Sequence, residues 1–399
     1  MGGDIMECFL VSKGKTYSTI KFNDYGSVIE RLSCTALSVA RENLAATHVG
    51  NYALFGGGEF NDASIKDTVD DYDTSLTRST PTTLSMARYD LESTHVGNYA
   101  LFGGGVYGYE SSYSNTVDAY DTSLTRSTPT ALSAGRSELS ATHVGNYALF
   151  GGGHYSSVSN VVDAYDTSLV RNTESDLGEP RSRLAATHVG DYALFGGGYG
   201  SSSYSNTVDA YDTSLTRSTP TALSAARDDL GATHVGNYAL FGGGHDSSVS
   251  NVVDAYDTSL TRTTPAALSV ARDYLSATHV GDYALFGGGD GSSSISNTVD
   301  AYDTSLTRTT PTELSVARYL LAATTVGDYA LFGGGRPFID PVSNTVDAYT
   351  NSKLKLTIYP GSKYKLNDMG SELEATEITV LDLDKPINGY IKIKNSTLS

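Results

Sequence analysis

One twelve-residue string occurs seven times in this chain with almost no change. It reads THVGNYALFGGG at residues 47–58 and, in its last copy, TTVGDYALFGGG at residues 324–335. Successive copies start 45 to 48 residues apart. This period constrains the fold more than any other feature, because every repeat has to form the same structural unit. Without helical patterning, a period of this length predicts the blade of a β-propeller rather than a helical solenoid.

Each repeat contains four short runs that are typical of β-strands. Examples are SATHVG, NYALFGG, NTVDAYD and SLTRSTPTALS, and glycine, asparagine and serine residues separate them. Four antiparallel strands repeated radially make up a propeller blade. The sequence therefore predicts an all-β protein with one four-stranded blade per repeat.

The two ends of the repeat region complete one another. The seventh repeat stops after SNTVDAY (343–349) and lacks a fourth strand, whereas RLSCTALSVAR (31–41) aligns without gaps to RTTPTELSVAR (308–318). We therefore expect residues of about 28–38 to pair with the seventh blade and close the ring. Closure hides the unpaired edges that would otherwise promote aggregation. The prediction is a closed propeller of seven blades.

The repeats differ mainly in two places. One is the loop after the glycine triplet, which varies in length and sequence. The other is a residue pair that follows a repeated arginine, and the seven pairs are Glu42-Asn43, Tyr89-Asp90, Ser137-Glu138, Ser182-Arg183, Asp228-Asp229, Asp273-Tyr274 and Tyr319-Leu320. Because strand direction alternates within a blade, both places lie on one face, here called the variable face. The opposite face, the conserved face, carries the turns VGNY or VGDY and DTSLTR, which barely change.

The variable face is a candidate recognition surface. Surface loops can drift without any function, but the turns of the conserved face are also surface loops and have not drifted. Tyrosine, serine, glycine, aspartate and histidine dominate the variable loops, a composition that suits broad contact with adaptable hydrogen bonding. Aromatic rings beside carboxylates and hydroxyls suit sugars, and they suit a protein epitope equally well. The candidate ligand-binding residues are Phe60, Tyr89, Tyr107, Tyr109, Tyr113, His154, Tyr155, Tyr199, Tyr204, Asp228, His245, Asp246, Asp273, Tyr274, Asp290, Tyr319, Arg336 and Phe338.

Six histidines share one position of the repeat, and threonine replaces them in the seventh copy. They are His48, His95, His143, His188, His234 and His279, with Thr325 last. The first strand of a blade lines the central channel, so these side chains form a ring there. We expect the ring to be too wide for the three or four ligands of a metal site. The predicted role is hydrogen bonding between adjacent blades.

The remaining candidate chemistry is weak. His154 and His245 lie in variable loops and, with Tyr155 or Asp246, would supply groups for catalysis, but loop histidines are more often surface contacts. The repeats are also too alike for one dedicated active site. The glycine triplets are followed by no Lys-Ser/Thr, which argues against phosphate binding, and the aspartate of YDTS is predicted to form a turn. We assign no catalytic residue, no metal and no cofactor.

Charge and hydropathy exclude two classes of partner. The formal net charge of −18 argues against nucleic acid, whose backbone requires clustered lysine and arginine. No run of about 18 apolar residues is present, so we expect no membrane insertion. The opening MGGDIMECFLVSKGK lacks the pattern of a secretory signal, and we expect synthesis in the cytoplasm.

The ends of the chain differ in composition from the repeats. Ten of the eleven lysines lie outside the repeats. We predict three segments: an N-terminal β segment (1–27), the propeller (28–350) and a C-terminal β segment (351–399). Both junctions fall on the conserved face, so the two ends are expected to form one small β-module there. Simple padding of an edge strand is the alternative.

The repeats resemble the kelch repeat, in which an arginine, a glycine doublet after an apolar strand and a Tyr-Asp pair recur. Here these residues are Arg88, Gly103–Gly104 and Tyr120–Asp121, with matching sets in the other copies over residues 28–350. The kelch fourth strand usually carries a tryptophan, whereas here it reads LTRSTPTAL. The resemblance implies a propeller. It does not choose between enzyme and binding protein, because kelch propellers include both.

The ending YPGSKYKL…GYIKIKN resembles the tails of kelch-like proteins of phages and prophages of Gram-positive bacteria. This resemblance implies a component of a virion or tail-like particle. The β-module of the two chain ends, here called the tail module, would attach it to other particle proteins. The leading hypothesis is a non-enzymatic binding protein that presents the variable face to a host glycan or protein. The alternatives are a propeller enzyme acting on carbohydrate and a purely structural assembly protein.

Overall fold

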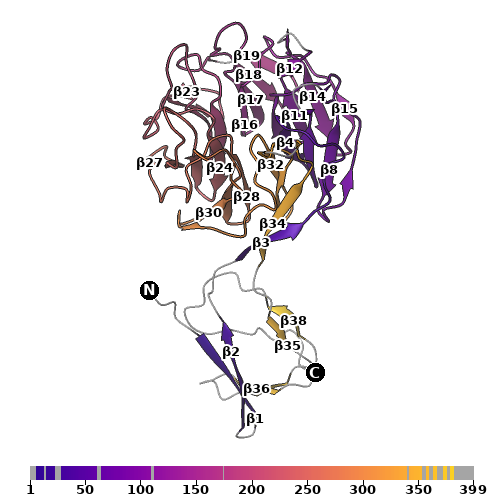
Figure 1. The fold of residues 1–399 in the computed structure, drawn as a ribbon, viewed down its shortest axis with the longest axis vertical. Coiled ribbons are helices and arrows are strands. Elements are labelled where there is room, and N and C mark those ends of the chain that lie inside the picture. The colour runs from indigo at the N-terminus through magenta and orange to yellow at the C-terminus, as the bar shows by residue number, and fades with distance from the viewer. Residues whose placement is uncertain are drawn as a thin grey trace. The chain divides into compact units, whose positions relative to one another are not determined.

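The computed structural model is all-β and contains seven four-stranded antiparallel sheets arranged as the blades of a propeller (Figure 1). The structure describes residues 6–12, 15–22, 28–60, 64–108, 112–173, 175–338, 341–352, 356–358, 363–365, 372–374 and 378–381. No helix in these residues is long and apolar enough to cross a membrane. The predicted fold class is confirmed.

Every blade repeats the same strands. The innermost strands are β4 (Ala45–Val49), β10 (Glu92–Val96), β16 (Ser140–Val144), β20 (Ala185–Val189), β24 (Gly231–Val235), β28 (Ser276–Val280) and β32 (Ala322–Val326). The second strands are β5 (Tyr52–Gly56), β11 (Tyr99–Gly103), β17 (Tyr147–Gly151), β21 (Tyr192–Gly196), β25 (Tyr238–Gly242), β29 (Tyr283–Gly287) and β33 (Tyr329–Gly333). The pairing register is the same from Ala45↔Gly56 in the first blade to Ala322↔Gly333 in the seventh.

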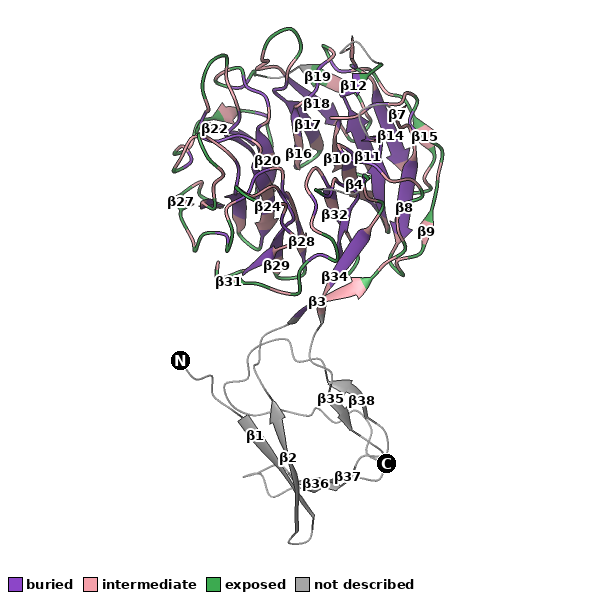
Figure 2. Cartoon of the chain, viewed as in Figure 1, coloured by how far each residue is buried: buried purple, intermediate pink, exposed green. Residues whose placement is uncertain are grey.

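The third strands are largely buried, whereas the fourth strands are mostly short and partly exposed. The third strands are β8 (Val69–Asp73), β14 (Val117–Asp121), β18 (Val162–Asp166), β22 (Val208–Asp212), β26 (Val253–Asp257), β30 (Val299–Asp303) and β34 (Val346–Ser352). The fourth strands are β9 (Arg78–Ser79), β15 (Arg126–Ser127), β19 (Arg171–Thr173), β23 (Arg217–Ser218), β27 (Arg262–Thr263), β31 (Arg308–Thr309) and β3 (Val28–Ser33). In Figure 2 the third strand β8 is buried and the fourth strand β9 is partly exposed.

The ring closes as predicted. The seventh blade has the strand order β3-β34-β33-β32, so residues from the N-terminal part of the chain supply its fourth strand. Arg31 of β3 forms an ion pair with Asp347 at 3.0 Å, and Arg308 of β31 forms the equivalent pair with Asp300 at 3.0 Å. The structure therefore confirms the alignment of residues 31–41 with 308–318, because the aligned arginines form equivalent ion pairs. The last propeller residue, Thr350, pairs with Tyr329 beside a turn of the conserved face.

Aromatic side chains and a glycine hold neighbouring blades together. A Cβ atom on Gly56 would lie only 2.8 Å from the Phe102 ring of the next blade, so the first glycine of the triplet permits close approach. Phe102 packs edge-on against Tyr120, with ring centroids 6.0 Å apart. The Tyr120 hydroxyl donates a hydrogen bond of 2.8 Å to the Thr82 carbonyl in the outer part of the preceding blade. These contacts recur between all neighbouring blades, and they explain why the string YALFG is the same in every blade.

Each blade also contains a buried ion triad. Asp118 of the repeated VD dipeptide accepts from Arg88 at 2.7 Å and from Arg126 at 3.2 Å, and neither Arg88 nor Asp118 is exposed. The Arg88 guanidinium also donates to the Phe102 carbonyl at 3.1 Å. A buried charge is tolerated only when it is paired and hydrogen-bonded in this way. The repeated arginine and VD aspartate are therefore parts of the scaffold.

The YDTS aspartates form turns on the conserved face, as predicted. The Asp121 carboxylate accepts from the backbone amides of Ser123 at 2.9 Å and Thr125 at 3.0 Å. The following Leu124 adopts a positive φ of 61°. A carboxylate that caps its own turn explains the conservation of this loop between blades.

The two chain ends form a second compact unit, which comprises Met1–Ile29 and Asn351–Ser399, while Glu30–Thr350 forms the propeller unit. Its described strands are β1 (Met6–Ser12), β2 (Lys15–Phe22), β35 (Leu356–Ile358), β36 (Lys363–Lys365), β37 (Glu372–Glu374) and β38 (Ile378–Leu381). β1 pairs with β2, β35 with β38, and β36 with β37. β1 also contacts β36, so both ends contribute to one β-module, as predicted.

Candidate functional site

A cavity of about 510 Å³ opens at the centre of the variable face. It is lined by the second residue of each variable pair. These seven residues all adopt a left-handed backbone with φ between 47° and 54°, and they are Asn43, Asp90, Glu138, Arg183, Asp229, Tyr274 and Leu320. Left-handed backbone costs roughly 1–2 kcal/mol for a residue with a side chain. The left-handed residue nevertheless recurs in every blade and places seven side chains around one cavity.

Backbone hydrogen bonds join these residues from blade to blade. Among these described residues, six of the seven links are made, at 2.9–3.2 Å. In each link an amide donates to the carbonyl of the preceding blade, and the links are Asn43 to Leu320, Asp90 to Asn43, Arg183 to Glu138, Asp229 to Arg183, Tyr274 to Asp229 and Leu320 to Tyr274. The backbone therefore forms the ring, and the side chains lining the cavity can vary without disturbing it.

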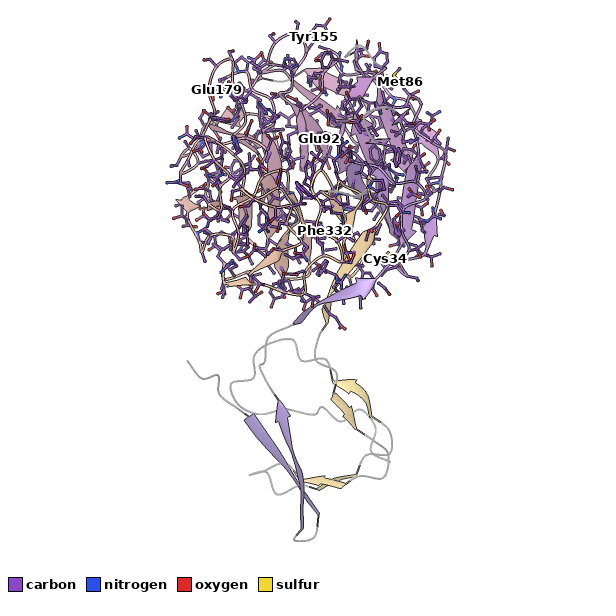
Figure 3. All side chains as sticks on the ribbon, viewed as in Figure 1. Cys34, Met86, Glu92, Tyr155, Glu179 and Phe332 are labelled. Carbon is purple, nitrogen blue, oxygen red and sulfur yellow. The ribbon has the colours of Figure 1, made fainter. Side chains whose placement is uncertain are left out.

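The cavity lining is asymmetric although the scaffold is sevenfold. Blades two and three contribute the acidic Asp90 and Glu138, whereas blades six and seven contribute Tyr274 and Leu320. Glu92 adds a further carboxyl group and lies toward the middle of the propeller (Figure 3). Small residues occupy the position of Glu92 in the other blades: Ala45, Ser140, Ala185, Gly231, Ser276 and Ala322. Glu92 therefore adds to the asymmetry of the cavity lining.

Arg183 is the cation of the cavity and has several partners. Its guanidinium lies 3.2 Å from the Asp228 carboxylate, 3.5 Å from Asp229 and 3.9 Å from Glu138. Its central carbon also lies 5.2 Å from the centre of the Tyr199 ring, within the range of a cation–π interaction. Arg183 thus connects the cavity to an aromatic residue of a variable loop.

Three carboxyl groups in the cavity have raised pKa values. Burial raises the pKa of Asp90 to about 7, with a further contribution from Glu138. Burial raises the pKa of Glu92 to about 8 and that of Asp229 to about 8, and the charge of Asp228 adds to the second shift. Near neutral pH these groups therefore offer both protonated donors and charged acceptors.

Replacing Glu92 by alanine, the residue found in three other blades, is expected to stabilise the protein by about 1–3 kcal/mol near pH 8. The folded state holds a proton on Glu92 that the unfolded state releases above its ordinary pKa of 4.5, so this carboxyl costs stability as pH rises toward about 8. Urea unfolding of both proteins near pH 5 and pH 8 measures the difference. A gain that is no larger near pH 8 than near pH 5 would contradict the argument.

The predicted aromatic residues of the variable loops form two clusters. In the first, the Tyr113 hydroxyl lies 3.3 Å from Nδ1 of His154, and the Tyr113 and Tyr155 rings are 5.4 Å apart. In the second, the Tyr204 hydroxyl lies 3.2 Å from Nδ1 of His245, and the Tyr199 and Tyr204 rings are 5.2 Å apart. Each cluster spans two adjacent blades.

The other predicted residues lie around these features. The first members of the variable pairs form short bridges with the loop after the glycine triplet, and these bridges are Tyr89↔Val106, Asp228↔His245, Asp273↔Asp290 and Tyr319↔Arg336. Arg336 also contacts the buried Glu42. Phe60 and Tyr107 lie in loop strands β6 (Glu59–Phe60) and β12 (Val106–Tyr107), which pair with β7 (Ser64–Ile65) and β13 (Ser112–Tyr113). Asp246 accepts from the Ser248 amide at 3.1 Å, Phe338 is 78% exposed, and Tyr109 falls outside the described residues.

Sequence reasoning named two residues of the cavity, Tyr274 and Tyr319, and left out most of its lining. The omitted polar residues are Asn43, Asp90, Glu92, Glu138, Arg183 and Asp229. The signal was present in the chain, because the second member of each variable pair changes type from blade to blade. Glu92 was equally detectable as the one large residue at a position of small ones. What the pattern does not reveal is that a left-handed backbone aims these side chains at one centre.

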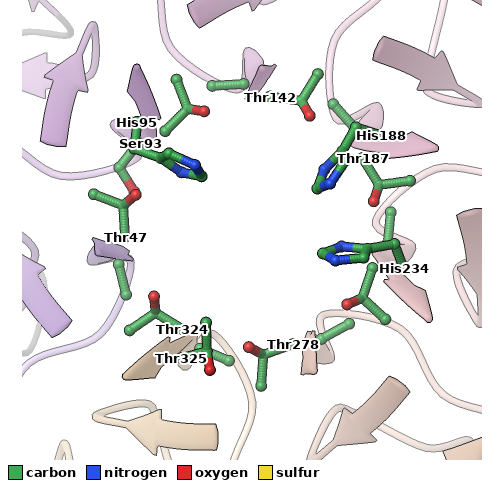
Figure 4. Close-up of a pocket in the computed structure, with 18 of the residues that line it drawn as sticks. Thr47, Ser93, His95, Thr142, Thr187, His188, His234, Thr278, Thr324 and Thr325 are labelled. Carbon is green, nitrogen blue, oxygen red and sulfur yellow. The ribbon is translucent and has the colours of Figure 1, made fainter. Parts of the chain in front are cut away.

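The repeated histidines line a narrower channel of about 140 Å³ (Figure 4). Neighbouring imidazoles are only 4.1–4.2 Å apart between ring centroids and are tilted by 45–48°. The inner strands converge on the channel, and this brings the imidazoles of neighbouring blades into contact. The predicted contact between blades is confirmed, but it is made ring against ring rather than by the predicted hydrogen bonds. In the described part of the chain, no three His, Cys, Asp or Glu residues are grouped to hold a metal ion.

No protein-family model matches the chain, and no curated protein matches it. Among solved structures, the chain is similar to one titled "Structure of YjhT", with a TM-score of 0.54 and 11% sequence identity. The match covers 70% of this chain and 99% of that one. At this identity the likeness shows the propeller fold and carries no information on activity.

Proposed function

We propose that the protein is a kelch-like binding protein and that the cavity of the variable face binds a carbohydrate. The observation that supports this most directly is the ring of seven left-handed residues. Its backbone is nearly sevenfold and its side chains are not, which is the arrangement of a scaffold that presents a specific site.

The chemistry of the lining supports a sugar. A volume of about 510 Å³ lies within the range of small-molecule sites. The rings of Tyr274 and Tyr319, with centroids 6.2 Å apart, offer aromatic surface for sugar C–H groups. On the other side of the cavity, Asp90, Glu92 and Glu138 offer the donors and acceptors that hydroxyl groups require.

A phage tail or surface-adhesion setting is part of the same proposal. Its support is the resemblance of the C-terminal segment to phage-associated proteins, together with the position of the chain junction. Thr350, the last residue of the propeller unit, pairs with Tyr329 beside a conserved-face turn. Display of several copies on one particle would add avidity to weak individual sites. The tail module would contact other particle proteins.

The test is a glycan array followed by calorimetry with the best ligand. Arg183→Ala removes the cation of the cavity and is expected to weaken binding by about tenfold or more, the cost of a charge-assisted hydrogen bond. The matched control is Asn146→Asp in a conserved-face turn, because the chain itself uses aspartate at the equivalent Asp191. Binding unaffected by Arg183→Ala, or weakened equally by the control, contradicts the proposal.

One observation favours a second function, an enzyme acting on carbohydrate. A carboxyl group with a pKa of about 8, such as Glu92 or Asp229, is still protonated at neutral pH and can act as a general acid. Incubation with the array ligand and analysis of products distinguishes the two functions. An enzyme would form product, and Glu92→Gln would abolish product formation while retaining binding.

A further inference from the structure

The two aromatic clusters of the variable loops have the same geometry. Tyr113 and Tyr204 each contact a histidine of the next blade 41 positions later in the chain. The hydroxyl-to-nitrogen distances are 3.3 and 3.2 Å, the ring centroids are 5.9 and 5.7 Å apart, and the interplanar angles are 64° and 66°. The second tyrosine of each cluster differs in place: Tyr155 directly follows His154, whereas Tyr199 lies in the same loop as Tyr204. The chain therefore builds the same tyrosine–histidine pair twice, on blades two and three and again on blades four and five.

Both clusters adjoin the wall of the central cavity. The His154 carbonyl accepts from the amide of Ser137 at 3.0 Å, and Ser137 directly precedes the cavity residue Glu138. The His245 carbonyl accepts from the amide of Asp228 at 2.9 Å, and Asp228 directly precedes the cavity residue Asp229. In each cluster, the backbone of the histidine is thus hydrogen-bonded to the residue that directly precedes a cavity-lining residue. The two hydrogen bonds occupy equivalent positions in their blades.

The second cluster is also connected to the cavity through side chains. The Tyr199 ring lies 5.2 Å from the Arg183 guanidinium, and Arg183 lines the cavity. Polar and aromatic groups therefore continue from Tyr204 through Tyr199 to Arg183. In the first cluster, Tyr155 is 56% exposed and lies at the edge of the propeller in Figure 3.

We propose that the ligand is an extended polysaccharide whose repeating unit occupies the central cavity and the two tyrosine–histidine clusters as outer subsites. This inference rests on the proposed function and names its ligand class. Two matching tyrosine–histidine pairs on one ring of blades fit a ligand that presents the same chemical unit more than once. The exposed Tyr155 and the half-buried tyrosines of the clusters provide stacking and hydrogen bonds for sugar units. Linked units bind at a high effective concentration once the first unit is held.

The test is the affinity of the full-length protein for a ladder of oligosaccharides built from the best array ligand. The wild type is expected to bind longer oligomers at least about tenfold more tightly than the single unit, because linked subsites add avidity. Tyr155→Ala and Tyr204→Ala each remove one outer subsite. Each change is expected to reduce the gain with length, and the double variant to abolish it, without changing the affinity for the single unit.

The control is Val170→Thr, which changes an exposed apolar residue of a conserved-face turn to the threonine found at the equivalent Thr125. It should retain the full gain with length, and thermal unfolding checks that all variants are folded. An affinity independent of length, or a gain that survives the double variant, overturns the polymer inference but leaves single-unit binding in the cavity intact. Loss of single-unit binding in the tyrosine variants would instead place the primary site in the loops and contradict the proposed function. Failure of every length to bind would contradict both.

Discussion

Replacing Asp163 by alanine is expected to lower the free energy of unfolding by about 3–5 kcal/mol, the usual cost of breaking a buried ion pair. Asp163 is fully buried and accepts from Arg136 at 2.8 Å and from Arg171 at 3.0 Å. It also accepts from the Ser133 amide at 3.2 Å. Its removal leaves the buried Arg136 guanidinium without its counter-charge. Equilibrium unfolding in urea measures the loss.

The matched control for this change is Arg171→Ala. Arg171 is the outer member of the same triad and is partly exposed, so its removal leaves the inner pair intact and is expected to cost only about 1 kcal/mol. Equal losses in the two variants would contradict the view that the inner pair carries the stability of the blade. The same contrast is available in blade five with Asp254 and Arg262.

Acidification below about pH 6 is expected to destabilise the propeller steeply through the histidine ring. Burial lowers the pKa of His95 to about 2, of His143 and His234 to about 4, and of His279 to about 3, and it also lowers the pKa of His48 and His188. The folded ring stays neutral, whereas the unfolded chain binds protons below its ordinary pKa of 6.5. Stability is therefore complete above that pH and falls as pH decreases toward the folded pKa values. Each histidine contributes up to about 1.4 kcal/mol per pH unit.

Urea unfolding at several pH values between about 7 and 5 measures this loss, and His143→Thr isolates its cause. The seventh blade carries Thr325 at this position, so the substitution is compatible with the channel. The variant is expected to lose about 1 kcal/mol less per pH unit than the wild type over this range, because up to one fewer proton is taken up on unfolding. Identical slopes for the two proteins would show that the ring does not cause the acid sensitivity. Ordinary carboxylates affect both proteins alike and cancel in the comparison.

The sequence was sufficient for the scaffold because each repeated residue has the same surroundings in every blade. Gly56 is repeated because the next blade's Phe102 leaves no room for a side chain. Asp121 is repeated because it caps its own turn. Ring closure could also be predicted from the sequence, because Arg31 aligns with Arg308. Each of these arginines pairs with an aspartate of a third strand. Local chemistry that recurs seven times fixes strand, turn and register together.

The candidate site was harder to predict from the sequence, because it depends on where side chains that differ between the repeats come together. Asp90 and Arg183 are two blades apart in the chain, and only the left-handed backbone ring brings them to one cavity. Asp228 precedes Asp229 directly, yet it is buried against Arg183 beside the cavity rather than lining it.

The binding function depends most directly on the central cavity of the variable face. A crystal structure of the complex with the best array ligand is the measurement that tests it. We predict a sugar unit in the cavity, in contact with Arg183 and with the carboxyl groups of Glu92 or Glu138. A ligand bound to the conserved-face turns, or to the module of the chain ends while the cavity stays empty, would contradict this function.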